Sequence, residues 1–160
     1  MSAPDIEPGV YFIQNYGTGT VMEVHNGSST DGAPVKAYTK LEMSDKEVAC
    51  QLWIISEATG GYTIENAASR TFMELPSDES DTVFCKAKND SNNYQKWYIS
   101  RTNQRSAYVL QVHGKSGNTT HWHAALHHGN SADGTIIVKH KNKYGHATTD
   151  SKLMWHIVRA

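Results

Sequence analysis

The candidate reactive side chains of this sequence are its histidines, carboxylates and thiols. Eight of the nine histidines lie between His113 and His156, and His121 and His123 would share one face of a strand. A zinc site needs such ligands to converge with tetrahedral geometry, and nothing in this spacing brings them together. We therefore expect no metal and no cofactor. We interpret the cluster as surface or hydrogen-bonded histidines, with some pH sensitivity because histidine titrates near neutrality.

The carboxylates and thiols give equally little support for catalysis. Asp78, Glu79 and Asp81 form an acidic turn, and paired carboxylates at a fixed separation are typical of glycoside hydrolases. A flexible turn does not hold two carboxylates at such a separation, so we expect a solvated loop. Cys50 and Cys85 lack an evident histidine–asparagine setting, and we expect buried, inert thiols. The sequence therefore predicts a protein that is not an enzyme.

Composition excludes two further classes of function. The chain carries 15 basic and 16 acidic residues, so it lacks the excess positive charge that binds nucleic acid. It contains no apolar run of membrane-spanning length, and we expect no membrane insertion. Residues 1–9 have neither the basic start nor the apolar stretch of a signal peptide, and two cysteines do not form a disulfide framework. We expect a cytoplasmic protein, with export by a non-classical route left open.

The sequence contains an internal repeat, and the strands of the repeated unit would hold any functional site. Residues 9–15 (GVYFIQN) return as residues 60–66 (GGYTIEN), and more faintly as residues 107–111. Each copy is followed downstream by a tryptophan. Four positions recur 51 residues apart, and the closing tryptophans complete the pattern: Tyr11/Tyr62, Ile13/Ile64, Asn15/Asn66 and Glu23/Glu74, with Trp53, Trp97 and Trp155. We expect one domain over residues 1–160, with repeats at about 9–56, 60–100 and 106–159.

Short alternating runs separated by turn residues predict an all-β fold. We expect four strands in each repeat and twelve in total. In the first two repeats the predicted strands are residues 11–15, 21–24, 34–38 and 52–55, then 62–66, 72–75, 82–85 and 96–99. One such unit cannot bury its apolar face alone, so the three must close against each other. The closed solution that we predict is a β-trefoil with pseudo-threefold symmetry, in which the three tryptophans pack in the core.

Residues 21–38 (VMEVHNGSSTDGAPVKAY) contain an acid, a glycine-rich turn, Asp31-Gly32, a valine strand and an aromatic, and Gln51-Leu52-Trp53 follow them. In this pattern the first repeat resembles a ricin B-type (R-type) lectin repeat. The resemblance covers nearly the whole chain, strongly in the first two repeats and weakly in the third. In lacking a signal peptide and disulfides, the sequence resembles the cytoplasmic mushroom members of the family, which are proposed to act in defence.

The resemblance implies a shallow sugar pocket in each competent repeat. An acid on the second strand accepts hydrogen bonds from two sugar hydroxyls, and an aromatic on the third strand stacks on a galactose-type ring. A polar residue near the glutamine-any-tryptophan motif completes the set. Such a site binds in the millimolar to micromolar range, so useful avidity needs several sites or a dimer.

When the sugar-binding positions of the family are mapped onto this sequence, the first repeat matches them best. Two departures matter: the acid is a glutamate where the family usually has aspartate, and Cys50 stands where asparagine is frequent. Asp45, Lys46 or Glu47 could replace the missing contact. The predicted carbohydrate-binding residues are Glu23, Lys36, Tyr38 and Gln51.

The other two repeats depart further from the family pattern. In the second repeat Lys86 falls in the aromatic slot, so we expect a weaker or altered site composed of Glu74, Asn92, Asn93 and Gln95. In the third repeat Ala125 takes the acid slot and His140 the aromatic slot, which removes the main hydroxyl acceptor. The segment 119–123, which contains His121-Trp122-His123, could instead bind something else or pack against a partner chain.

The resulting prediction is a non-catalytic lectin that recognises terminal galactose or N-acetylgalactosamine, with a homodimer as one route to avidity. The alternative is a β-trefoil protease inhibitor that acts through protruding loops, of which residues 41–47 and 141–150 are candidates. A third and weaker reading is a signalling or cytoskeleton-binding trefoil without a sugar function.

Overall fold

The computed structural model describes residues 6–77, 81–112, 122–141 and 148–160. Its regular elements are strands and single turns of 3₁₀-helix, and the described residues contain no α-helix. The all-β prediction is therefore confirmed. No helix in this part of the chain is long and apolar enough to cross a bilayer.

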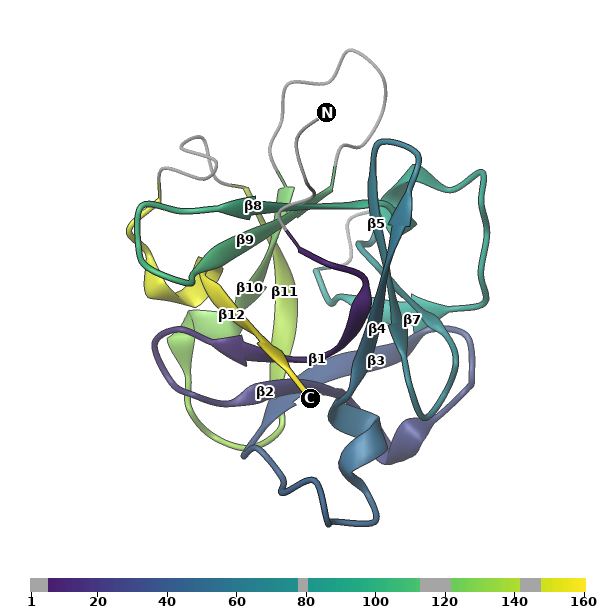
Figure 1. Ribbon diagram of the computed structural model, residues 1–160, viewed down its shortest axis with the longest axis horizontal. Helices are drawn as coiled ribbons and strands as arrows, with labels where there is room; N and C mark the ends of the chain where they lie inside the picture. Colours follow the sequence, from purple (N-terminus) through teal and green to yellow (C-terminus); the bar gives the residue numbers. More distant parts are fainter. Residues whose placement is uncertain (1–5, 78–80, 113–121, 142–147) are drawn as a thin grey trace.

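Six strands pair in a ring and close a barrel (Figure 1). Neighbours around this ring pair antiparallel in the order β1, β4, β5, β8, β9, β12 and back to β1. The strands of the ring are β1 (Gly9–Asn15), β4 (Trp53–Ala58), β5 (Gly61–Asn66), β8 (Trp97–Arg101), β9 (Tyr108–Val112) and β12 (Trp155–Arg159). Their inward positions are apolar at alternate residues, which buries one face of every strand.

Three further strand pairs join this ring. They are β2 (Val21–Val24) with β3 (Ala33–Tyr38), β6 (Phe72–Glu74) with β7 (Phe84–Lys86), and β10 (Trp122–Leu126) with β11 (Thr135–Lys141). β3 also pairs with both β7 and β11, and Thr82 forms an isolated bridge to Val138. β3 therefore lies between strands of the other two pairs.

The three tryptophans of the repeat are fully buried, as predicted. In the strand register they lie opposite three tyrosines, in the pairs Tyr11–Trp53, Tyr62–Trp97 and Tyr108–Trp155. Each indole Nε1 donates a hydrogen bond of 2.9–3.0 Å to a backbone carbonyl, namely those of Met22, Met73 and Ala124. These bonds make Glu23, Glu74 and Ala125, which come next in the chain, equivalent positions.

The recurring asparagines form the turns after β1 and β5. Asn15 Oδ1 accepts hydrogen bonds from the backbone amides of Gly17 and Thr18, at 3.0 and 3.1 Å. Asn66 Oδ1 accepts two equivalent bonds after β5. Both side chains are almost fully buried, so they satisfy turn amides that the strand ladder cannot reach.

The two Asp–Gly turns connect neighbouring strand pairs. Asp133 Oδ1 accepts hydrogen bonds from the backbone amide and hydroxyl of Thr39, at 2.7 and 2.9 Å, just beyond the end of β3. Asp31 Oδ1 accepts one from the Ala87 amide at 2.9 Å, just beyond β7. Gly32 and Gly134 follow these aspartates with φ of 91° and 89°, a conformation that favours glycine. The turn before β11 thus fixes the end of β3.

Candidate functional site

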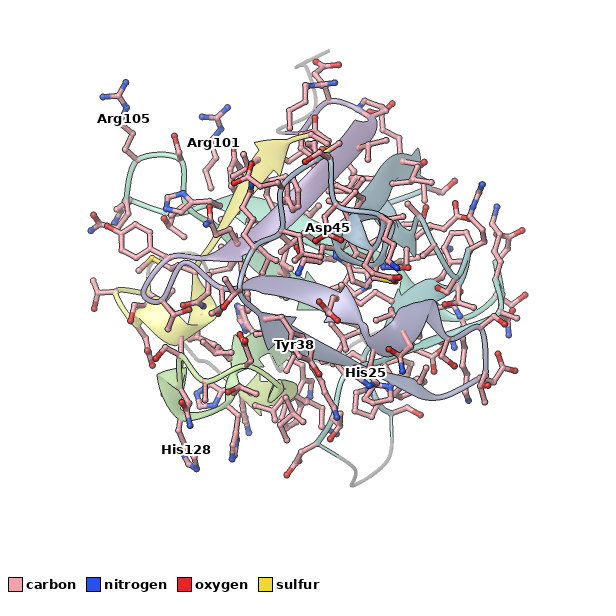
Figure 2. All side chains as sticks on the ribbon, turned by 90° about the horizontal axis from the view of Figure 1, so that it is seen from below. His25, Tyr38, Asp45, Arg101, Arg105 and His128 are labelled. Carbon is pink, nitrogen blue, oxygen red and sulfur yellow. The ribbon has the colours of Figure 1, made fainter. Side chains whose placement is uncertain are left out.

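A hollow of about 410 Å³ lies beside the β2–β3 pair of the first repeat. Figure 2 shows His25 and Tyr38, which both line it, near one another. The residues that line the hollow are Glu23, His25, Asn26, Tyr38, Leu41, Glu47 and Cys50. Two of the four predicted site residues, Glu23 and Tyr38, therefore face the same space.

Glu23 is half-buried on β2 and is held from behind by Gln51. Gln51 Nε2 donates to Glu23 Oε1 at 3.0 Å and to the Thr39 carbonyl at 3.0 Å. Gln51 Oε1 accepts from the Leu41 amide at 2.8 Å. With its side chain 1% exposed and its amide used within the protein, Gln51 positions the carboxylate from the interior and does not line the hollow.

Lys36 lies directly across from Glu23 in the β2–β3 register, two residues before Tyr38 on the same strand. This is the placement that strand alternation predicts. Lys36 is nevertheless outside the set of residues that line the hollow.

Tyr38 forms a continuous aromatic surface with His25. Tyr38 Oη and His25 Nδ1 lie 3.2 Å apart, within hydrogen-bond distance. The ring centroids are 6.0 Å apart and the ring planes differ by 16°. The hollow is thus lined by two nearly parallel aromatic rings, and an aromatic ring can contact the apolar face of a sugar ring.

Burial and like charges favour the neutral forms of the ionisable groups here. Burial is the largest influence and raises the pKa of Glu23 above its usual 4.5, against the opposing effects of the Gln51 bond and of His25; Asp133 and Glu47 raise it further. Burial, with Glu23 and Asp133, also raises the pKa of Tyr38. The pKa of the Cys50 thiol is raised by burial and by Glu23 and Glu47, so this cysteine is a poor nucleophile.

Two members of the site, His25 and Asn26, were not predicted from the sequence. They form the 3₁₀ turn His25–Gly27, in which Asn26 has a left-handed φ of 55°. His25 is two residues beyond Glu23, so extending the strand alternation by one step would have placed both on one face. Of the three insertion residues that could supply a contact, Glu47 lines the hollow and Asp45 accepts a hydrogen bond from its amide at 2.8 Å.

The second repeat contains the same acid–glutamine pair, but the acid is more deeply buried. Gln95 Nε2 donates to Glu74 Oε1 and to the Ala87 carbonyl, both at 3.0 Å, and Glu74 is 5% exposed. In the strand register Lys86 lies across from Phe72, just as Tyr38 lies across from Val21 in the first repeat. Lys86 therefore holds the position of the aromatic, as the sequence alignment predicted. Asn92 is occupied as the cap of a 3₁₀ turn through the Tyr94 amide, while Asn93 is exposed.

The third repeat has lost the pair altogether. Ala125 takes the place of the acid and Leu153 that of the glutamine, and both are buried. The register puts His140 in the aromatic position, across from His123. Trp122 lies under the ammonium group of Lys139, 5.0 Å from the ring centroid, and residues 119–121 of the predicted aromatic segment lie outside the described residues.

No group of three or more histidine, cysteine, aspartate and glutamate side chains that could hold a metal ion occurs among the described residues. His113, His121 and His146 of the histidine cluster, and Asp78 and Glu79 of the acidic turn, lie outside them. Cys50 and Cys85 are buried free thiols, as expected, and burial raises the pKa of Cys85 to about 12.

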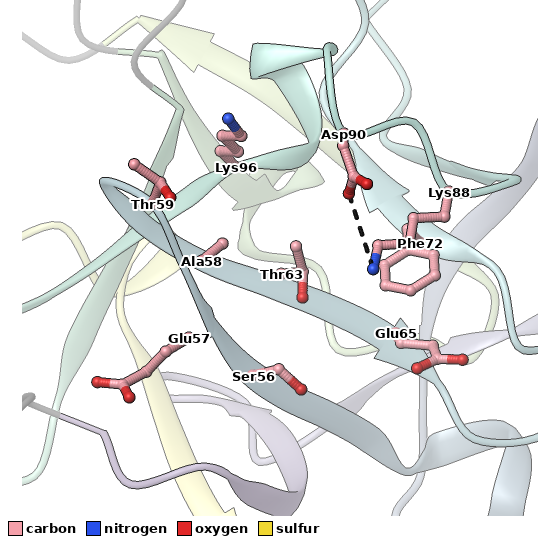
Figure 3. Close-up of a pocket in the computed structure, with 10 residues that line it drawn as sticks. All are labelled: Ser56, Glu57, Ala58, Thr59, Thr63, Glu65, Phe72, Lys88, Asp90 and Lys96. Atoms are coloured by element: carbon pink, nitrogen blue, oxygen red, sulfur yellow. Dashed lines mark ion pairs between the residues drawn. The ribbon is translucent and has the colours of Figure 1, made fainter.

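A second hollow, of about 430 Å³, lies over the β4–β5 hairpin (Figure 3). Its lining mixes both signs of charge, and Lys88 Nζ lies 3.7 Å from Asp90 Oδ1 across one end. Glu65 also lines it and is paired with Arg70 at 2.6 Å. These carboxylates therefore already have cationic partners within the protein.

Solved structures similar to this one share its fold at low sequence identity. A designed threefold-symmetric protein, ThreeFoil, has a TM-score of 0.75 and 16% identity, covering 95% of this chain and 99% of its own. The Rhizoctonia solani agglutinin has a TM-score of 0.75 and 16% identity, and the match covers 99% of this chain and 100% of the agglutinin. The Macrolepiota procera ricin B-like lectin, solved in complex with lactose, has a TM-score of 0.70 and 16% identity, and the match covers 98% of this chain and 99% of that lectin. A search of curated proteins finds no matching sequence.

A family model assigns the chain on its sequence. The model for ricin-type β-trefoil lectin-like domains matches residues 49–140, which is more than half of the chain. This match agrees with the β-trefoil-like architecture of the barrel and its three added strand pairs. The chain therefore belongs to the family of ricin-type β-trefoil lectin-like domains.

Proposed function

We propose that this protein is a non-catalytic lectin whose first-repeat hollow binds terminal galactose or N-acetylgalactosamine. The observation that carries the proposal is that the Glu23 carboxylate and the Tyr38 ring line one hollow, with Gln51 fixing the carboxylate from behind. A carboxylate accepts hydrogen bonds from two adjacent hydroxyls, while an aromatic ring covers the C–H face of the sugar. The family supports this proposal, as does the lactose complex of the Macrolepiota procera lectin.

We extend the proposal to the arrangement of the chain. One domain over residues 1–160 would comprise three four-stranded repeats with pseudo-threefold symmetry. The recurring tyrosine–tryptophan pairs, the indole–carbonyl bonds and the likeness to a designed threefold protein support this division. Only the first repeat would then retain both the acid and the aromatic of a sugar site. The proposed defence role and cytoplasmic location rest on the mushroom-lectin resemblance alone.

Calorimetric titration with galactose and lactose tests the proposed site. We expect Glu23→Gln and Tyr38→Ala each to weaken binding about tenfold or more, because a charge-assisted hydrogen bond or a stacking surface is lost. Lys86→Ala is the matched control, since Lys86 holds the register position of Tyr38 in the second repeat. Unchanged affinity in both site variants, with Lys86→Ala reducing it, would move the sugar site to the second repeat.

A further inference from the structure

The hollow of the first repeat is lined by two carboxylates, and its lining contains no lysine or arginine. The two carboxylates are those of Glu23 and Glu47. Asp133, at the neighbouring turn, adds a third negative charge close enough to raise the pKa of Glu23. Lys36 lies across from Glu23 on β3 but outside the hollow. The space is therefore electrostatically suited to a ligand that carries positive charge.

The hollow in Figure 3 provides an internal comparison. It is of similar volume and is also lined by three carboxylates, those of Glu57, Glu65 and Asp90. Its lining, however, includes Lys88 and Lys96, and Glu65 has its own partner in Arg70. Two of the three carboxylates in that hollow, Glu65 and Asp90, thus have a cationic partner in the protein, whereas no lysine or arginine lines the hollow of the first repeat.

The aromatic surface favours the same kind of ligand. The Tyr38 and His25 rings lie beside the two carboxylates, and an aromatic face attracts a cation as well as the C–H face of a sugar. An ammonium group is a compact donor of three hydrogen bonds, which matches carboxylate acceptors. A neutral N-acetyl group offers one amide N–H and a carbonyl that the carboxylates would repel.

On the basis of the proposed lectin function, we infer that the site prefers a protonated 2-amino sugar, galactosamine or its polymers, over the neutral and N-acetylated sugars. The hydroxyl contacts of Glu23 and the stacking on Tyr38 stay as proposed. Glu47 and Glu23 add ionic hydrogen bonds to the ammonium group. Because the site is partly exposed to water, the gain over galactose is expected to be about threefold to tenfold.

Calorimetric titrations of the whole protein with galactosamine, galactose and N-acetylgalactosamine, at about pH 7 and about pH 9, test this inference. The amino group of such a sugar loses its proton at about pH 8, as an α-amino group does, so it is charged at pH 7 and mostly neutral at pH 9. We expect galactosamine to bind tightest at pH 7 and to lose its advantage at pH 9, with galactose unchanged. Galactosamine binding equal to or weaker than galactose at pH 7 would overturn the inference.

Charge-neutralising variants assign the effect to the site. Glu47→Gln should bring the affinity ratio of galactosamine to galactose toward one at pH 7. Glu57→Gln, in the Figure 3 hollow, is the matched control and should leave that ratio unchanged. A ratio that is insensitive to Glu47→Gln would overturn the inference. Neutral galactose bound without an amine preference would leave the proposed lectin function intact, whereas no binding of any of the three sugars would remove both.

Discussion

Glu23 and Gln51 act as one unit, with the acid at the surface and the amide beneath it. The same unit recurs as Glu74 and Gln95, and in the third repeat both members are apolar together. Replacing both residues together costs less stability than replacing one. Removing one partner leaves the other buried without its hydrogen bonds, whereas an apolar pair in their place changes the free energy of unfolding little.

Replacing either buried glutamine should therefore destabilise the protein, whereas only the replacement in the first repeat should weaken sugar binding. We expect Gln51→Ala and Gln95→Ala each to lower the free energy of unfolding by about 1–3 kcal/mol, since each leaves backbone and carboxylate groups unpartnered. Only Gln51→Ala should also weaken galactose binding. Urea denaturation and calorimetry measure the two effects. Equal loss of binding in both variants would mean that the glutamine acts through global stability alone.

Acid should weaken sugar binding by protonating Glu23, without destabilising the fold through that residue. The pKa of Glu23 in the folded protein lies above its usual 4.5, chiefly because of burial, so the carboxylate is protonated at a pH above 4.5 and loses acceptor capacity. We expect galactose affinity to fall as pH drops through that folded pKa. The contribution of Glu23 to stability runs the other way: it is fully present below 4.5 and is lost as pH rises through the folded pKa.

A pH series of galactose titrations, with circular dichroism at each pH, separates these effects. Glu23→Gln should bind weakly with no such acid step, because it has no proton to gain. An acid step of equal size in this variant would attribute the pH dependence to another ionisable group.

At the scale of elements, the site depends on a turn from a distant part of the chain. Asp133 fixes Thr39 beyond the end of β3, and Gly134 donates its amide to the Ala37 carbonyl at 2.8 Å. Tyr38 lies between these two anchors. The turn before β11 thus determines where the aromatic ring of the first repeat is held.

Removing this anchor should reduce both stability and binding. We expect Asp133→Ala to lower the free energy of unfolding by about 1–2 kcal/mol and to weaken galactose binding several-fold, because the end of β3 loses two hydrogen bonds. Asp31→Ala removes the corresponding bond to Ala87 in the second repeat and should lower stability without affecting binding. Denaturant midpoints and titrations check both, and undiminished affinity in Asp133→Ala would contradict the account of the anchor.

The strands were predictable because their cause is local. Alternation and turn residues predicted the existence and order of the strands in the first two repeats, although β4 continues to Ala58 and β7 begins only at Phe84. The resemblance to R-type lectin repeats also placed Glu23 and Tyr38 in one site, and both line the same hollow. What the sequence could not supply was the direction of hydrogen bonds: Gln51 points inward to satisfy Thr39 and Leu41, a role that depends on three segments meeting in space.

At the scale of the whole molecule, the three repeats differ in what they can bind. The first repeat has the acid and the ring at a hollow, the second has a buried acid and Lys86, and the third has neither acid nor glutamine. We predict a calorimetric stoichiometry of about one galactose per chain, and no cross-linking of glycoconjugates by a monomer. A stoichiometry near two or three would mean that the altered repeats bind as well.

The most direct measurement of the central claim is the mapping of amide chemical shifts by nuclear magnetic resonance during a galactose titration. We expect the shifted amides to cluster at Glu23, His25, Asn26, Tyr38 and Glu47, around one hollow. Saturating shifts centred on Glu74 and Lys86, or on the hollow over the β4–β5 hairpin, with the first repeat unaffected, would contradict the central claim.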